Sequence, residues 1–213
     1  MKKTLKIAFL AFAFLVMGRA HSYAVLIVDT DIPSMISGMS LTPTQYLAGE
    51  ITLPDAKRIS DIEGWIDQYD QVATSLTLSI YGDAGLIPDG NDLIFRNTFL
   101  VPGCGGGSCA DWYGLHGMSL DLGPGSYWVA FEVLAGNTYD GAMSVIPPHP
   151  LNYAAFYNAG TGSMAWWSQG QAGFGLRVYS DESTGPAVPE PSTIVLSVLG
   201  LGGLAFKKKF KNP

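Results

Sequence analysis

The sequence has 213 residues, of which 47% are hydrophobic, 12% aromatic and 14% charged. This composition excludes a disordered acidic chain, because the apolar and aromatic side chains are enough to form a core. It also excludes a collagen-like repeat, since the 26 glycines follow no three-residue period. No apolar run reaches the roughly 18 residues of a spanning helix, which excludes a protein with several membrane spans. The length is typical of one domain.

The net charge of -6 hides an uneven distribution of basic residues. Eight of the 12 lysines and arginines lie before residue 20 or after residue 206. Between residues 25 and 188 there are four basic and 17 acidic residues, a net charge of -13. Such a segment repels phosphate, so we expect no nucleic-acid partner.

Residues 1–24 have the pattern of a secretory signal peptide. Three lysines precede an apolar run at residues 7–17, and small residues follow up to Ala24. A basic region, a short apolar region and a small-residue site are the three parts of a cleaved signal. We expect cleavage after Ala24, with Ala20 as the alternative site, and export of the remaining chain across the inner membrane.

Apolar and polar residues alternate with period two through residues 25–180, the expected exported domain. In residues 76–81, Leu76 and Leu78 share one face with Ile80, whereas Ser79 and Tyr81 lie on the other, which is typical of a half-buried strand. Similar alternation predicts strands at residues 93–101, 118–122, 127–133 and 174–178.

The segments at residues 93–101 and 59–66 allow more specific predictions. In residues 93–101 the alternation places Leu93 and Phe95 on the same face, with Arg96 opposite. Residues 59–66 fit either a helix or a strand, but Gly64 is a poor residue for a helix interior and favours a bulged strand. Turns rich in glycine, proline and aspartate separate the strands, and this pattern predicts an all-β fold, an antiparallel β-sandwich.

An acidic turn gathers oxygen donors at Asp83, Asp89, Asn91 and Asp92. Hard oxygen ligands of this kind suit Ca²⁺, although the spacing is not that of the helix-loop-helix calcium loop. Asp and Asn also cap the backbone of turns, so the alternatives are a calcium site and a solvated turn. No other cofactor is expected.

Cys104 and Cys109 are the only cysteines, separated by Gly-Gly-Gly-Ser. Export would place them where disulfides persist, and the glycines would let so small a ring close. We predict a structural disulfide, because a redox pair usually has two intervening residues and a metal site would need further ligands.

Residues 152–169 are rich in aromatic and amide side chains. Aromatic faces stack on sugar rings, so Tyr157, Trp166 and Trp167 are candidate ligands for polysaccharide. The alternative is that most of these aromatics belong to the core. Trp166 and Trp167 are adjacent, so on a strand they point to opposite faces and at most one is expected to be exposed.

After a polar linker at residues 181–188, the chain ends in three parts, residues 189–213. Pro189, Glu190 and Pro191 are followed by an apolar stretch at residues 193–206 and a basic tail at residues 207–211. The apolar stretch would form a short transmembrane helix of about 21 Å, less than a hydrocarbon core of about 30 Å. The trailing lysines favour the cytoplasmic side, which places the preceding domain outside.

These three parts resemble the PEP-CTERM sorting signal of Gram-negative bacteria that make extracellular polysaccharide. The resemblance implies a transient inner-membrane anchor, recognition by an exosortase, and release or attachment at the cell surface. Residues 80–85, 112–115 and 125–131 resemble parts of the jelly-roll-like modules that often precede this signal, and no catalytic residue is implied by that likeness.

The sequence thus favours a non-enzymatic exported protein with a structural or adhesive role in the envelope or extracellular matrix. Its expected partners are an exosortase-like enzyme and the secretion machinery. The first alternative is a carbohydrate-binding module, calcium-assisted or not, that acts on exopolysaccharide. The second is a divergent glycoside-active enzyme, because two carboxylates that meet only in space cannot be recognised in a sequence.

Overall fold

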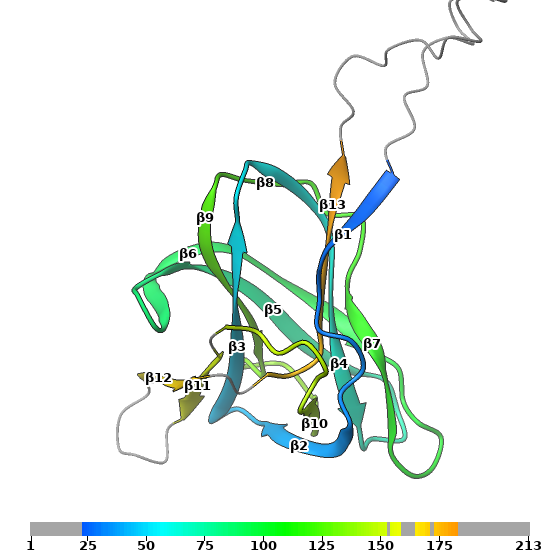
Figure 1. The fold of residues 1–213 in the computed structure, drawn as a ribbon. Helices are drawn as coiled ribbons and strands as arrows, with labels where there is room; N and C mark the ends of the chain where they lie inside the picture. Colours follow the sequence, from blue (N-terminus) through cyan, green and yellow to red (C-terminus); the bar gives the residue numbers. More distant parts are fainter. Residues whose placement is uncertain (1–22, 153, 159–164, 171–172, 183–213) are drawn as a thin grey trace, which may run out of the picture. The chain divides into compact units, whose positions relative to one another are not determined.

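The structure is a computed structural model that describes residues 23–182, apart from residue 153 and residues 159–164 and 171–172. The described part forms two antiparallel sheets and contains no helix, as predicted (Figure 1). The predicted signal peptide and the C-terminal apolar segment lie outside the described residues, except that the expected cleavage site at Ala24 falls at the start of the first strand.

The first sheet is built around one long strand. β4 pairs with β13 and then β10 along one edge, and with β8 and then β7 along the other. β1 extends the sheet beyond β13, and β2 extends it beyond β10. The strands are β1 (Tyr23–Asp29), β2 (Met35–Leu41), β4 (Lys57–Gln68), β7 (Cys109–Leu115), β8 (Leu120–Leu122), β10 (Gly141–Val145) and β13 (Leu176–Glu182).

The second sheet has six strands in the order β12-β11-β3-β9-β5-β6. Its strands are β3 (Gln45–Leu53), β5 (Thr74–Asp83), β6 (Pro88–Val101), β9 (Gly125–Glu132), β11 (Ala154–Asn158) and β12 (Ala165–Gly170). The ambiguous segment at residues 59–66 lies within β4 and is a strand with an irregularity at Ser60, where the pairing with β13 shifts register.

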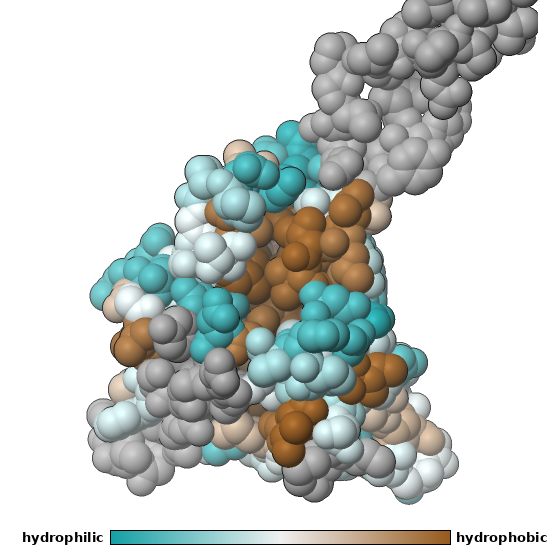
Figure 2. All heavy atoms as spheres, viewed as in Figure 1, coloured by the Kyte–Doolittle hydropathy of each residue, from teal (hydrophilic) through white to brown (hydrophobic). Residues whose placement is uncertain are grey.

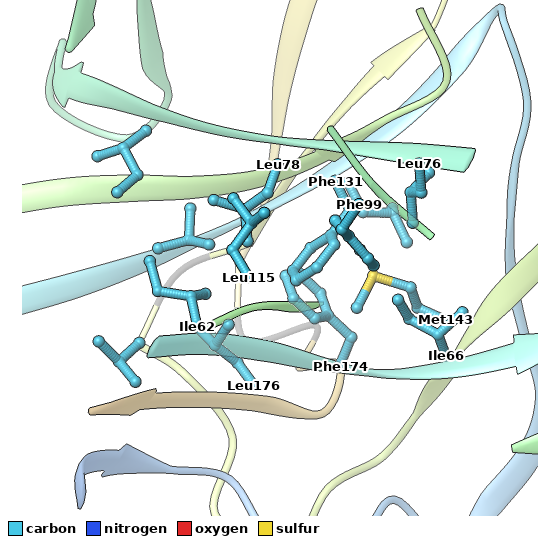
Figure 3. Close-up of a cluster of buried hydrophobic side chains, with 14 of the residues drawn as sticks. Ile62, Ile66, Leu76, Leu78, Phe99, Leu115, Phe131, Met143, Phe174 and Leu176 are labelled. Atoms are coloured by element: carbon cyan, nitrogen blue, oxygen red, sulfur yellow. The ribbon is translucent and has the colours of Figure 1, made fainter. Parts of the chain in front are cut away.

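The hydrophobic core lies between the two sheets (Figure 3). Phe131 from β9 is at its centre, with edge-on ring contacts to Phe99 at 6.4 Å and to Phe174 at 6.0 Å between ring centroids. A Cβ atom on Gly64 of β4 would lie 2.7 Å from the Phe131 ring, so the absence of a side chain there lets the ring reach the opposite sheet. The two sheets therefore pack face to face as a β-sandwich.

The second sheet is buried on both faces along most of β5 and β9, which the sequence did not indicate. Leu76, Leu78 and Ile80 face the core as predicted, but Ser79 and Tyr81 on the other face of β5 are also buried. On this outer face Tyr81 forms a small cluster with Ala48, Trp128 and Ala130, and Ile87 and Trp166 pack against that cluster. The prediction of a half-buried strand was wrong because alternation records polarity and not whether a polar face is covered.

The alternation predicted for β6 is interrupted by a bulge. Phe95 pairs with Ile80 of β5, but Leu93 pairs with Tyr81, so one extra residue lies between the two pairs on β6. Leu93 therefore lies on the outer face with Tyr81, not on the core face with Phe95. A bulge reverses the alternation on one side of it, which corrects the predicted placement of Leu93.

Phe131→Ala should lower the free energy of unfolding by about 3–5 kcal/mol, because it removes a fully buried aromatic ring and leaves a cavity between the sheets. Urea unfolding followed by tryptophan fluorescence measures the change. Leu100→Ala on β6 is the control, since Leu100 is 71% exposed and its truncation should cost less than about 0.5 kcal/mol. Equal losses in the two variants would contradict the assignment of Phe131 to the centre of the core.

Candidate functional site

A pocket of about 420 Å³ opens on the outer face of the second sheet. Six strands or their adjoining turns contribute to it, so residues far apart in sequence meet there. The described lining residues are Tyr46, Tyr81, Gly90, Asn91, Arg96, Glu132, Leu134, Tyr157, Ala165 and Trp166.

Strand register brings the aromatic rings of the pocket together. Tyr157 of β11 is paired with Tyr46 of β3 on one side and with Trp166 of β12 on the other. The Tyr46 and Tyr157 rings are stacked at 5.1 Å with an interplanar angle of 2°, and Tyr157 and Trp166 lie 5.4 Å apart. Trp166 also meets the edge of Tyr81 at 6.0 Å. These neighbouring rings form an aromatic wall, here defined as Tyr46, Tyr157 and Trp166.

Beside the aromatic wall, a buried carboxylate is held by three donors. Glu132 is only 2% exposed, and its Oε1 accepts a hydrogen bond of 2.7 Å from the Tyr81 hydroxyl. Its Oε2 accepts a hydrogen bond from the Ser79 hydroxyl and another, of 3.1 Å, from Nη2 of Arg96. A buried charge is costly unless it is paired and hydrogen-bonded, and here both conditions are met.

Arg96 connects the members of this group to one another. Its Nε donates to Ser79 Oγ at 2.8 Å and its Nη2 donates to the Tyr81 hydroxyl at 2.6 Å. Ser79 and Tyr81 therefore each accept from Arg96 and donate to Glu132. We call Ser79, Tyr81, Arg96 and Glu132 the buried polar network.

The hydroxyls of Tyr46 and Tyr81 stay protonated well above neutral pH, because the pKa of each is raised. Burial raises the pKa of Tyr81, and the nearby Glu132 carboxylate raises it further. Burial and Glu132 raise the pKa of Tyr46 in the same direction. Tyr81 is therefore a hydrogen-bond donor to Glu132 across the physiological pH range.

Two of the three predicted ligand residues line the pocket. Tyr157 and Trp166 are part of the aromatic wall, whereas Trp167 pairs with Phe156 and does not line the pocket. Trp167 is 46% exposed. The prediction that the adjacent tryptophans point to opposite faces is consistent with this arrangement.

Sequence reasoning missed Tyr46 and the whole buried polar network. Arg96 is one of only four basic residues in the acidic segment, and Glu132 is the one charged residue in the apolar stretch at residues 127–134. Those two isolated charges were the available signal, although their pairing across three strands was not visible in the sequence.

The acidic residues predicted to form one turn belong to two strands, because Asp83 ends β5 whereas Asp89, Asn91 and Asp92 lie in β6. Two of them accept local hydrogen bonds. Asp83 Oδ1 accepts from Trp128 Nε1 at 2.8 Å and from the backbone N–H of Gly85 at 3.0 Å, and Asp89 Oδ1 accepts from the N–H of Asn91 at 2.9 Å. Asp92 lies against Gly82, and Asn91 lines the aromatic pocket. Among the residues that the structure describes, no three acidic, histidine or cysteine side chains are grouped to hold a metal ion.

The predicted disulfide joins Cys104 and Cys109, whose Cα atoms are 5.7 Å apart. Gly105, Gly106 and Gly107 have φ values of 67°, 142° and 96°. Glycine adopts such positive angles without steric strain, which lets this short loop turn back to β7. The disulfide therefore closes the loop that leads from β6 into β7.

A second depression, of about 360 Å³, lies between β1 and β3 and differs in chemistry from the pocket. Figure 2 shows a hollowed hydrophobic area on this face. Its apolar lining includes Ile27, Ile51 and Leu151, and its polar lining includes Asp29 and His149. Among its described lining residues there is no phenylalanine, tyrosine or tryptophan, so it lacks the large ring surface of the first pocket.

Comparison with protein families identifies the C-terminal part of the chain. Residues 187–209 match the model of the PEP-CTERM protein-sorting motif. The chain carries a PEP-CTERM sorting motif. The match contains Pro189, Glu190 and Pro191, the apolar stretch at residues 193–206 and the first three residues of the basic tail. Comparisons with curated proteins and with solved structures found no match.

The PEP-CTERM motif implies export and membrane-anchored sorting by an exosortase-type system in a Gram-negative bacterium. The matched residues lie outside the part that the structure describes. Within the described part no helix is long and apolar enough to cross a membrane. The resemblance of the exported domain to jelly-roll-like modules stays a prediction.

Arg96→Met should lower the free energy of unfolding by about 1–3 kcal/mol at pH 7, because Glu132 keeps two hydroxyl donors but loses its cation. Methionine retains most of the apolar stem of arginine, so packing changes little. Urea unfolding measures the difference.

Arg58→Met is the matched control, since Arg58 also pairs with a carboxylate, Asp121, but both side chains are largely exposed. It should cost much less, because water and salt screen an exposed ion pair. Similar losses of unfolding free energy in the two variants would show that the Arg96–Glu132 pair stabilises the fold no more than an exposed ion pair does.

Proposed function

We propose that this exported PEP-CTERM protein has a non-enzymatic, adhesive role in the envelope or extracellular matrix, and that its pocket binds a sugar unit of an exopolysaccharide. The observation that carries the proposal is the aromatic wall of Tyr46, Tyr157 and Trp166 beside the buried polar network. The proposal joins the adhesive role expected from the sequence to its first alternative, carbohydrate binding.

The chemistry of the pocket matches that of a sugar. A pyranose has apolar C–H faces and a polar edge of hydroxyls, and the wall and the network offer the complementary surfaces. Tyr157 and Trp166 supply ring surface, while Arg96 and Asn91 supply polar groups in the same cavity. A volume of about 420 Å³ falls within the range of about 300–1,000 Å³ for small-molecule pockets.

The charged groups of the pocket favour binding over hydrolysis. Glycoside hydrolases use two carboxylates on either side of the scissile bond. Among the described lining residues Glu132 is the one carboxylate, and both its oxygens already accept hydrogen bonds from the network. We therefore propose a binding module and not a glycoside-active enzyme.

Trp166→Ala should weaken retention of the exported domain on the native exopolysaccharide at least tenfold, because it removes a ring of the aromatic wall. Trp167→Ala is the matched control, since it removes the same side chain from the neighbouring position outside the pocket. Affinity electrophoresis on gels that contain the polysaccharide measures retention, and a glycan array followed by a hydrolysis assay on the bound sugars tests the enzyme alternative.

Unchanged retention of Trp166→Ala, or an equal loss in both variants, would argue against sugar binding in this pocket. Hydrolysis of a bound glycan would contradict the non-enzymatic role. Circular dichroism of both variants should match the unaltered protein, so that a loss of retention reports on the pocket and not on folding.

Deletion of residues 189–213 should abolish processing and surface attachment, because it removes the motif, the apolar stretch and the basic tail together. Immunoblotting of cell fractions and surface labelling of intact cells measure the result. A control deletion of Ser183 to Gly185 shortens the linker and leaves the motif intact. If the protein that lacks residues 189–213 is processed normally, the proposed sorting route is wrong.

A further inference from the structure

The pocket joins apolar ring surface to polar groups whose formal charges cancel. Arg96 and Glu132 are the charged side chains among its described lining residues, and they are paired at 3.1 Å. The other polar lining groups are tyrosine hydroxyls and the amide of Asn91, which carry no charge at neutral pH. A ligand that enters the pocket therefore meets an aromatic wall and a polar network with no net charge.

Most of the N–H groups of Arg96 already donate hydrogen bonds within the buried polar network, so they are not available to an anion. Arginine grips a carboxylate best with two parallel N–H groups from neighbouring nitrogens. Nε is bonded to Ser79, and Nη2 is bonded to Tyr81 and Glu132. Only Nη1 has no acceptor within the described part of the chain. Arg96 is 37% exposed, so this nitrogen can reach a single hydroxyl or ring oxygen of a ligand, but it cannot form the two-nitrogen grip.

The surroundings of the pocket disfavour an anion further. Asn91, which lines the pocket, lies between Asp89 and Asp92 in the sequence of β6, and Asp92 is exposed to solvent. The segment between residues 25 and 188 has a net charge of -13. A polymer of uronic acids would approach against this field, whereas an uncharged polymer would not.

A cationic ligand is also poorly matched to the site, although the domain is acidic. Glu132 is buried behind Arg96, Ser79 and Tyr81, so its charge is compensated before any ligand arrives. The Arg96 guanidinium carbon lies 5.9 Å from the centre of the Tyr81 ring, so a cation already faces this ring. A protonated amino sugar would meet that cation.

We infer that the pocket selects an uncharged hexose unit over a uronic acid or a protonated amino sugar. This inference rests on the proposed function, since it names the class of sugar that the same pocket takes. It depends on the pairing of Arg96 with Glu132, and the test below can separate its failure from failure of sugar binding itself.

Binding of the exported domain should be measured by isothermal titration with matched probes at pH 5.5 and 150 mM salt, where the glucosamine amine is protonated and the uronic acid carboxylates are ionised. The probes are oligosaccharides of glucose, galactose and mannose, the three corresponding uronic acid oligosaccharides, and a glucosamine oligosaccharide. We expect at least one neutral probe to bind, with its uronic acid counterpart and the glucosamine probe at least tenfold weaker.

Equal or tighter binding of a uronic acid or of the glucosamine probe would overturn the inference and leave sugar binding in place. Failure of every probe to bind would overturn the proposed function and the inference together. Repetition at 500 mM salt separates two reasons for weak uronic acid binding. Salt screens the repulsion of the uronic acid by the acidic domain, but it does not free the Arg96 N–H groups that are bonded within the network.

Glu132→Gln provides a second test within the same pocket. The amide is nearly the same size and can still accept hydrogen bonds, but Arg96 is left without its balancing charge. The preference for the neutral probe over its uronic acid counterpart should fall at least fivefold. Asp55→Asn is the control, since it makes the same change in net charge at an exposed residue in the turn after β3.

An unchanged preference in Glu132→Gln, or an equal change in Asp55→Asn, would overturn the role of the Arg96–Glu132 pair. A melting temperature close to that of the unaltered protein confirms that the variant is folded. If Glu132→Gln does not fold, the comparison of probes on the unaltered protein still decides the inference.

Discussion

The buried carboxylate of Glu132 needs hydrogen-bond donors and a positive charge beside it, and this need fixes how the strands pair on the outer face of the second sheet. Glu132 lies on β9 at 2% exposure, and its donors come from β5 and β6. An uncompensated charge at this depth would be strongly destabilising, so the pairing of β9 with β5 and of β5 with β6 must keep these donors in place. The network is therefore both a restraint on register and one side of the pocket.

The aromatic wall depends on a different restraint, the pairing of β11 with β3 and β12. This pairing places Tyr157 between Tyr46 and Trp166, and Trp166 then reaches Tyr81 in the network. On the opposite face of the same sheet, Phe131 and its neighbours fill the space between the sheets. A polar network and an apolar core thus share one sheet, back to back, because adjacent residues of a strand point to opposite sides.

Much of the fold was predictable because it depends on near neighbours in sequence. Alternation located the core face of β5, and Gly64 correctly favoured a strand over a helix for residues 59–66. The short glycine loop predicted the Cys104–Cys109 bond. Prediction failed at Leu93, where a bulge reversed the alternation, and at Ser79 and Tyr81, whose polar face is covered by other parts of the chain.

By itself, the sequence determined the strand-rich character of the exported domain, the disulfide and the C-terminal PEP-CTERM motif, because each is encoded by consecutive or closely spaced residues. It also supplied Tyr157 and Trp166 as candidates, without showing which tryptophan would face a pocket. Only the tertiary structure brought Arg96 and Glu132 together, 36 residues apart, beside an aromatic wall drawn from three strands. The physical reason is that strand register decides which side chains become neighbours across a sheet. Register depends on which faces of the strands are buried in the packed structure, and a single segment of sequence does not specify this.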